Sequence, residues 1–426
     1  MQASVDDIAE VLAVADVKSI LHQYFKEGKG SDPIFHFYET FLAEYNPQER
    51  ERRGVYYTPE PVVSYIVRSL NIILKDKFAR KDGFATHSVT VLDPAGGTLT
   101  FLAEAAKLAV QEFAEKYGEG SKAKFIEDHI LKHFYAFELM VAPYAAGHLK
   151  MGYLLEELGH KLSGDERFQF YLTNTLEMEE LAQTSLPGMA SLSEESHLAG
   201  KVKKEKPILV ILGNPPYSGI SANASEHEVE INKGQKYITG YTIRTEKENG
   251  RTFYQLHPQE AKAKKKMRVK QKTWIGELIE YYKIINGSWL QERNPKMLQD
   301  DYVKFIRFAQ WKIDKSGEGA IGLITNRNYI ENITFPGMRE SLLTSYDEIH
   351  ILDLHGDLLR KQVLEDGSRD QNVFDITKGV AIILALRKRQ KNASPIIRYA
   401  EIIGTRGQKY DFLKSNDFRV FSKLSG

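Results

Sequence analysis

From residue 88 onward, short apolar runs alternate with stretches in which apolar residues recur at helical spacing. Runs rich in β-branched and aromatic side chains are typical of buried strands. Helical patterns lie between them, including one that begins near Phe101 and one that begins near Asp301. This alternation predicts an α/β domain with three layers. The seven predicted strands are Ser88–Asp93, His133–Glu138, Phe168–Asn174, Pro207–Asn214, Gly319–Asn326, Glu348–Leu354 and Gly379–Lys388.

The first fifty residues also show helical spacing. Asp32 can cap a helix that Pro33 begins, and Phe35, Tyr38 and Leu42 then fall on one face of it. The predicted parts of the chain are an N-terminal helical segment over residues 1–50, a main domain over 51–390 and the start of a C-terminal region over 391–426.

Two polar stretches interrupt the alternation. Residues 181–206 are rich in Ser, Glu and Lys and predict a solvated loop. Residues 218–300 form a long insertion that contains a basic run between Lys262 and Lys272. This run is either an exposed helix face or flexible arm, or a contact with nucleic-acid phosphates. The candidate phosphate contacts are Lys264, Lys265, Lys266 and Arg268.

Composition limits the classes of protein that the chain can represent. A chain of 426 residues with 42% apolar content can bury a large core. It has no cysteine, which excludes disulfides, thiolate zinc sites and cysteine nucleophiles. We see no apolar run long enough for a membrane span and no secretory leader, so we expect a cytoplasmic protein. The net charge of +1 gives no global attraction to nucleic acid, so such a contact requires a local basic patch.

The most informative motif is Gly213-Asn214-Pro215-Pro216-Tyr217, which follows an apolar predicted strand. Its two prolines fix φ and remove two N–H donors, so the strand tip presents carbonyls, an amide and a ring. The Asn214 oxygen and the Pro215 carbonyl can each accept a hydrogen from an exocyclic amine, while Tyr217 stacks on the heterocycle. For the tetrapeptide taken alone, a proline-rich turn without chemistry remains the alternative.

A glycine turn after the first predicted strand is a second candidate site. The sequence Asp93-Pro94-Ala95-Gly96-Gly97 leads into a helix, and its small residues let the backbone turn tightly beside a ligand. Glu138 ends the second predicted strand, where a carboxylate can accept hydrogen bonds from both ribose hydroxyls of an adenosine. Each signal is weak alone, but their order along the chain favours a nucleoside cofactor.

These motifs, together with Tyr56-Tyr57-Thr58-Pro59, resemble those of gamma-type adenine-N6 DNA methyltransferases. The chain is similar in particular to the methyltransferase part of type ISP and related restriction-modification or phage-defence enzymes. The likeness covers most of residues 31–390, including Leu298 to Phe305 and Asn372 to Asp375.

The resemblance implies a Rossmann-like S-adenosylmethionine-dependent methyltransferase fold with a seven-stranded, mostly parallel sheet. It implies S-adenosyl-L-methionine as methyl donor and double-stranded DNA as substrate. It also implies transfer to the N6 amine of a flipped-out adenine, without a metal site. By this match Asn214, Pro215, Pro216 and Tyr217 are catalytic, and Phe374 faces Tyr217 across the base. The residues that it places around the cofactor are Tyr57, Thr58, Pro59, Asp93, Pro94, Ala95, Gly96, Gly97, Glu138, Asn174 and Thr175.

One position departs from the family pattern. Members commonly have glycine two residues after the position of Gly97, where this chain has Leu99. Leucine adopts φ > 0 only at a cost, so the turn either stays in ordinary backbone space or is strained.

Two other functions stay open: methylation of protein glutamine or RNA bases, and a catalytically decayed module that binds DNA or cofactor. In the family, a target-recognition domain follows the catalytic domain, whereas only about forty residues follow the last predicted strand. We therefore expect a partner subunit, or further domains of a longer chain, to read the DNA sequence.

Overall fold

The computed structural model describes residues 58–164, 166–178, 190–217, 223–248, 251–292, 295–357, 367, 369–389 and 394–423. The predicted N-terminal helical segment, residues 1–50, and the candidate cofactor residue Tyr57 lie outside these residues.

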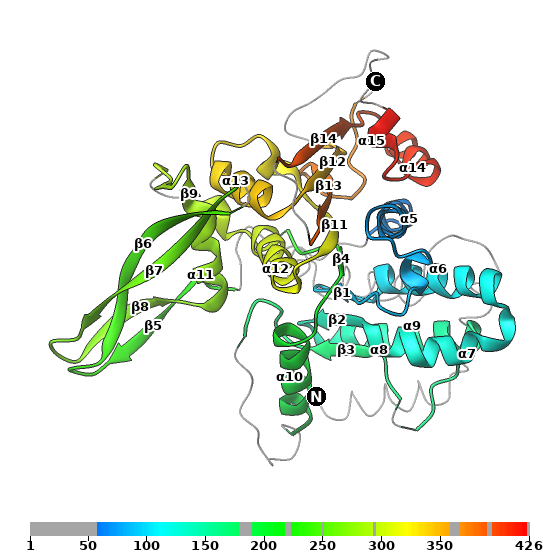
Figure 1. Ribbon diagram of the computed structural model, residues 1–426, viewed down its shortest axis with the longest axis horizontal. Coiled ribbons are helices and arrows are strands. Elements are labelled where there is room, and N and C mark those ends of the chain that lie inside the picture. The colour runs from blue at the N-terminus through cyan, green and yellow to red at the C-terminus, as the bar shows by residue number, and fades with distance from the viewer. Residues whose placement is uncertain are drawn as a thin grey trace. The chain divides into compact units, whose positions relative to one another are not determined.

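A mostly parallel sheet of eight strands forms the centre of the described chain (Figure 1). The strand order is β14-β12-β13-β11-β4-β1-β2-β3. Only β13 runs antiparallel to its neighbours in this sheet. The predicted α/β class is confirmed, while the predicted count of seven strands is wrong by one. The bounds are β1 Val91–Asp93, β2 Phe134–Glu138, β3 Gln169–Leu172, β4 Val210–Gly213, β11 Gly319–Asn326, β12 Glu348–Asp353, β13 Val380–Arg387 and β14 Ile396–Glu401.

Most of the strands that the sequence predicts are buried along nearly their whole length. All eight residues of β11 are buried, and β11 has the predicted bounds. The unpredicted strand β14 pairs with β12, but most of its residues are exposed. It therefore lacks the continuous apolar run by which a buried strand is recognised. The predicted domain boundary at residue 390 falls between two strands of this one sheet.

Helices cover both faces of the sheet (Figure 1), with α5 and α6 on one side and α12 and α13 on the other. Gly322 of β11 allows α5 to approach closely, because a Cβ there would lie 2.9 Å from a side-chain carbon of Ile66 and 2.7 Å from one of Leu70. The helix bounds are α5 Glu60–Lys77, α6 Thr100–Tyr117, α7 Lys122–Phe125, α8 Leu131–His133, α9 Val141–Glu157, α10 Ala190–Lys204, α11 Trp274–Glu280, α12 Asp301–Ser316, α13 Pro336–Ser345, α14 Arg406–Ser415 and α15 Val420–Lys423.

The prediction that residues 181–206 form a solvated loop is wrong over α10, and residues 181–189 lie outside the described residues. The charged surface of α10 hides a short apolar stripe, in which Ala199 and Val202 are buried. Two small residues three positions apart carry too little hydrophobic signal to stand out among Ser, Glu and Lys.

The insertion after β4 forms two antiparallel ribbons, which we call the arm (residues 226–272). One ribbon pairs β5 with β8 and the other pairs β6 with β7. The exposed-helix interpretation of the basic run is therefore wrong. The bounds are β5 Glu226–Ile231, β6 Lys236–Glu248, β7 Arg251–Lys262 and β8 Met267–Lys272, and a two-stranded ribbon of β9 Ile284–Ile285 and β10 Ser288–Trp289 follows.

The strand order reverses beside β1. From β1 the chain continues to β2 and β3 on one side, and then places β4 on the other side of β1. In open α/β sheets, ligands bind beyond the carboxyl ends of the strands at such a switch point. Asp93 ends β1 and Gly213 ends β4, so the two predicted motifs meet at this edge.

Candidate active site

The amide of Asn214 is held at both of its polar atoms. Asn214 Nδ2 donates to Thr58 Oγ1 over 3.0 Å, and the Tyr217 hydroxyl donates to Asn214 Oδ1 over 2.6 Å. The Ile324 carbonyl lies 3.2 Å from the same hydroxyl as a second acceptor. The structure thus joins the Tyr-Thr-Pro and Asn-Pro-Pro-Tyr motifs, which are 156 residues apart in the chain.

Gly213 allows β1 and β4 to end side by side. Its φ is +146°, and a Cβ would lie only 2.6 Å from Asp93 Oδ1. That same oxygen accepts the Ala95 N–H over 3.0 Å, which closes the turn after β1. Burial raises the pKa of Asp93 to about 7, the Ala95 hydrogen bond opposes the rise, and the nearby Glu138 adds to it.

Glu138 ties the turn after β1 to the end of β2. Its Oε2 accepts the Gly97 N–H over 2.9 Å, and its Oε1 accepts the N–H groups of Leu139 and Met140 over 2.9 and 2.8 Å. A carboxylate has about four lone-pair sites, so ribose hydroxyls would share these oxygens with the backbone.

Of the two backbone conformations expected for Leu99, the structure has the strained one, with φ > 0. Its φ is +63°, and its side chain is fully buried. The side chain packs against Gly147 of α9, where a Cβ would lie 3.1 Å from Leu99 Cγ. A left-handed non-glycine residue costs roughly 1–2 kcal/mol. The turn therefore keeps its shape at the expense of backbone strain.

Asn174 and Thr175 connect the end of β3 to two other parts of the site. Thr175 Oγ1 donates to the Pro94 carbonyl over 2.5 Å. Asn174 Nδ2 donates to Asn223 Oδ1 over 2.8 Å, and Asn223 Nδ2 donates to Asp301 Oδ1 over 3.1 Å. The sequence does not indicate Asn223, because a single asparagine inside a polar insertion carries no motif.

The rings of Tyr217 and Phe374 lie in contact, with their centroids 6.2 Å apart. Their planes meet at 77°, an edge-to-face arrangement, and both side chains are buried. The structure thus brings together the two predicted stacking residues. A base can lie between them only after at least one ring turns, since stacking requires each ring to present its face.

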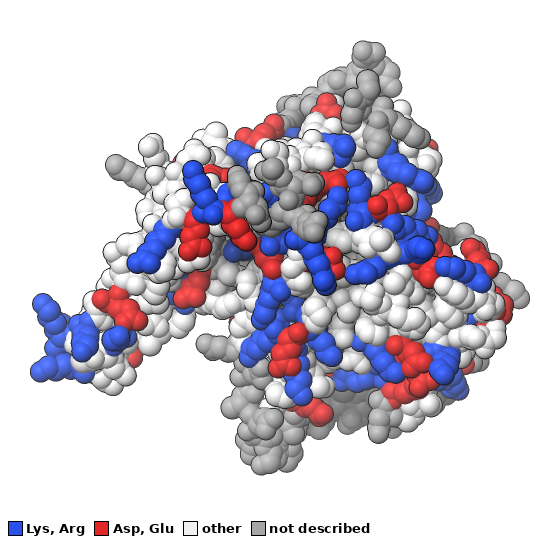
Figure 2. Space-filling view, viewed as in Figure 1, with Lys and Arg blue, Asp and Glu red and all other residues white. Residues whose placement is uncertain are grey.

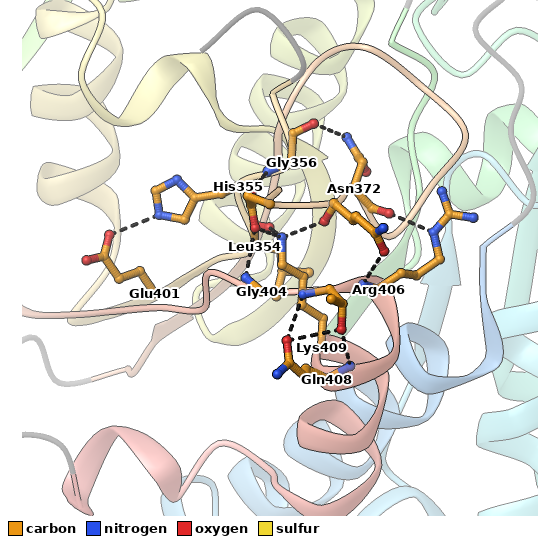
Figure 3. A network of polar contacts seen from close by, with 12 residues as sticks. Leu354, His355, Gly356, Asn372, Glu401, Gly404, Arg406, Gln408 and Lys409 are labelled. Carbon is orange, nitrogen blue, oxygen red and sulfur yellow. Dashed lines mark hydrogen bonds and ion pairs between the residues drawn. The ribbon is translucent and has the colours of Figure 1, made fainter. Parts of the chain in front are cut away.

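The loop that carries Phe374 is held by α14 (Figure 3). Arg406 donates to the Asn372 carbonyl over 2.8 Å and to the Phe374 carbonyl over 3.0 Å. Lys409 is fully buried, donates to the Leu354 carbonyl over 2.6 Å and pairs with Asp370 over 2.6 Å. We call Arg406, Lys409 and Asp370 the brace. The brace was not predicted, although Thr405 to Gln408 forms a capping box, a motif that sequence alone can reveal.

The candidate phosphate contacts lie at the far end of the arm, away from these residues. Lys264, Lys265 and Lys266 are exposed in the turn between β7 and β8, and Arg268 follows on β8. Across the helices that the structure describes, none combines the length and apolar character of a membrane span.

A family model described as N-6 DNA Methylase matches residues 29–269. A search of curated proteins found no match.

Solved structures share the fold at low sequence identity. The type ISP restriction-modification enzyme LlaBIII bound to DNA has a TM-score of 0.67 and 24% identity, over 99% of this chain and 26% of that chain. The DrdV–DNA complex has a TM-score of 0.64 and 23% identity, over 91% of this chain and 31% of that chain. LlaGI with a DNA substrate mimic has a TM-score of 0.65 and 21% identity, over 98% of this chain and 30% of that chain. The chain thus spans less than a third of each of these proteins.

Proposed function

We propose that this chain, which belongs to the N-6 DNA Methylase family, transfers a methyl group from S-adenosyl-L-methionine to an adenine in DNA. The acceptor is the exocyclic N6 amine of an adenine rotated out of the duplex, within a restriction-modification or phage-defence system. The observation that carries the proposal is the hydrogen-bonded series Thr58, Asn214 and Tyr217 at the end of β4. It lies at the sheet edge where Asp93 ends the neighbouring strand β1.

The residues around the turn after β1 fit an adenosine cofactor. A Cβ at Gly97 would have nothing within 4 Å, so the backbone there is open to a ligand. Glu138 at the end of β2 and Asn174 after β3 supply oxygens and an amide along the same edge. When bound, S-adenosylmethionine supplies a methyl group that its sulfonium already activates.

Asn214 and Pro215 would prepare the amine for attack. By accepting its two hydrogens, the Asn214 oxygen and the Pro215 carbonyl favour a pyramidal nitrogen and localise its lone pair. The cofactor, held beside the turn after β1, would supply the methyl group that this lone pair attacks and would keep the S–C bonding electrons as a neutral thioether. The amine then releases one proton to solvent, so the chain needs to position the amine more than to deprotonate it.

Tyr217 and Phe374 would hold the base once their edge-to-face contact has opened. Each base–aromatic stack contributes roughly 1–3 kcal/mol, enough to offset much of the cost of unstacking one base. The brace keeps the Phe374 loop in place while the ring reorients.

The experiment is a labelled methyl-transfer assay with DNA, RNA and protein as acceptors. We expect N6-methyladenine in digested DNA. Asn214→Ala should raise the barrier by about 2.7–4 kcal/mol while cofactor affinity stays nearly intact. Gln111→Ala, which truncates an exposed amide on α6, is the control and should leave turnover unchanged. Label found only in RNA or protein would favour methylation of RNA bases or protein glutamine instead. Cofactor binding without methyl transfer would favour a catalytically decayed module.

Sequence specificity would come from a partner subunit or from further domains of a longer chain. This chain spans less than a third of each of the three solved structures that share its fold. We expect the chain alone to bind random duplexes and a methylated-site consensus with similar affinity in competition. A preference of about a thousandfold, the lower edge of specific recognition, would contradict this expectation.

A further inference from the structure

The arm brings two turns together at its outer end. β5 leads outward, β6 returns, β7 leads outward again and β8 returns, as the pairs Ile231 with Met267 and Lys236 with Lys262 show. The Gly234 N–H donates to the Ala263 carbonyl over 2.8 Å, which ties one turn to the other. We call residues 232–236 and 262–266 the arm tip.

The inner end of the arm is fixed to the α/β domain. Arg251 at the start of β7 pairs with Asp347 over 3.0 Å, and both side chains are buried. Tyr254 donates to Glu340 of α13 over 2.7 Å. On the other ribbon, Gly276 of α11 lies against Ser225, where a Cβ would come within 2.0 Å of the Ser225 carbonyl oxygen. Packing at both ribbons therefore sets the direction of the arm.

Charges are balanced along the shaft of the arm, where β5 pairs with β8. Glu226 lies opposite Lys272, Glu228 opposite Lys270, and Glu230 opposite Arg268. Glu226 pairs with Lys272 over 2.5 Å, and Glu230 pairs with Lys266 over 2.7 Å. Cross-strand pairs of opposite charge stabilise a ribbon, so these cations are explained by folding.

The tip carries cations that folding does not explain. Lys233, Lys262, Lys264 and Lys265 are exposed and have no carboxylate partner within the described ranges. Lys262 even lies directly opposite Lys236, a like-charge pair that destabilises the ribbon. Figure 2 shows Lys and Arg side chains gathered at this end of the arm. A chain of net charge +1 thus concentrates uncompensated positive charge at one projecting point.

We propose that the arm tip binds the phosphate backbone of the DNA duplex that carries the target adenine; the identity of the duplex rests on the proposed function. Asn223 contacts Asn174 in the candidate active site and is nine residues before Asn232 of the tip. Nine extended residues reach about 30 Å, and DNA rises about 3.4 Å per base pair. The tip therefore contacts phosphates within about nine base pairs of the site.

A phosphate backbone fits this surface better than a lipid membrane does. Ile231 beside the tip and Ala263 within it are both buried. Membrane-surface elements insert apolar side chains, which this tip does not offer. Lysines act as point charges that hold a backbone without reading bases, so the contact adds affinity and no sequence preference.

The test is the salt dependence of duplex binding. The tip variant is Lys233→Gln with Lys264→Gln and Lys265→Gln, and the shaft control is Arg268→Gln with Lys270→Gln and Lys272→Gln. Both remove three positive charges from the arm. Each lost phosphate contact lowers the slope of log K against log salt by about 0.9, so we expect the tip variant to lose about 2–3 and the shaft control less than 1. Thermal unfolding of both variants confirms that the arm still folds.

An unchanged slope in the tip variant, or an equal change in both variants, would overturn the proposal. So would loss of binding to anionic lipid vesicles with DNA binding intact. The assay needs no methyl transfer, so it separates the two proposals. A tip effect without any N6-methyladenine would refute the proposed function alone, whereas methylation with a tip-independent slope would refute the arm contact alone.

Discussion

Tyr217 donates its hydroxyl hydrogen to Asn214 Oδ1 over 2.6 Å. The ring that would stack on the base therefore also orients the amide that would accept the amine of that base. Thr58 holds the other end of the same amide over 3.0 Å. Orientation and stacking are thus coupled through three side chains from two distant segments.

Replacing Tyr217 separates these two roles. Tyr217→Phe keeps the ring but loses one hydrogen bond, which is worth about 0.5–1.5 kcal/mol. We expect kcat to fall about 3- to 10-fold with DNA affinity nearly unchanged. Tyr217→Leu, which also removes the ring, should weaken DNA binding as well. Equal loss of DNA affinity in both variants would mean that the hydroxyl holds the fold of the site rather than the amide.

Leu99→Gly sets relief of strain against loss of packing. A glycine removes roughly 1–2 kcal/mol of left-handed strain, whereas truncating a buried leucine costs about 2–5 kcal/mol. The packing energy lost is larger than the strain removed, so we expect the free energy of unfolding to fall by about 1–3 kcal/mol. Leu99→Ala keeps the strain and should be less stable than Leu99→Gly by about 1 kcal/mol. Denaturant titration measures this order, and a glycine variant more stable than the wild type would contradict it.

Leu99 also bears on the cofactor. We expect calorimetry with S-adenosylmethionine to detect binding by the wild type, because Gly96 and Gly97 still permit a close approach. Absence of binding that Leu99→Gly restores would support the decayed-module alternative.

Asp93 should make stability fall as pH rises. Its pKa is raised from 3.8 to about 7 in the folded state, so between these values the folded chain binds a proton that the unfolded chain has lost. Its contribution is full below about pH 4 and is lost as pH rises through 7. Each unit of difference between the folded and unfolded pKa corresponds to about 1.4 kcal/mol. Asp93 therefore contributes at most about 4 kcal/mol to the free energy of unfolding.

The check is Asp93→Asn, which cannot ionise and keeps an oxygen for the Ala95 N–H. Relative to the wild type, its Tm should rise between pH 5 and pH 8. A difference in Tm that does not vary with pH would show that Asp93 does not titrate in this range.

Arg406 should act on the base without touching it. Arg406→Ala removes its bonds to the Asn372 and Phe374 carbonyls, and ordering each freed backbone residue again costs about 1–2 kcal/mol. We expect KM for DNA to rise about tenfold, with cofactor affinity unchanged. Arg406→Lys keeps the charge but loses the planar fork, so it should rescue little. Fluorescence of 2-aminopurine at the target position reports base flipping, and an unchanged signal with a raised KM would assign Arg406 to folding.

The sequence predicts this fold well wherever burial is complete. The strand β11 is buried along its length and mainly apolar because helices cover both sides of it, and its bounds follow from that run. The arm strands have both faces partly in water, so charged residues such as Glu228 and Lys270 occupy positions that a core strand would make apolar. Hydrophobic pattern cannot detect such strands, although the turn sequence Asn232-Lys233-Gly234 is a visible signal.

Motifs predict the site only in part. Asn214 and Asp93 lie at the ends of two neighbouring strands, β4 and β1. The order of the motifs along the chain already predicts that they lie close together. The brace depends on a buried pair between Asp370 and Lys409, which are 39 positions apart and belong to no motif. Contacts of this kind arise from tertiary packing, which a single sequence does not reveal.

The buried root of the arm, where Arg251 meets Asp347, has a thermodynamic consequence for DNA binding. A segment that orders only when it binds loses conformational entropy at that moment, at about 1–2 kcal/mol per residue. The arm loses that entropy during folding, because its root and its cross-strand pairs already fix the ribbons. Attraction between the tip lysines and phosphates is therefore available directly for affinity and for a fast encounter with DNA.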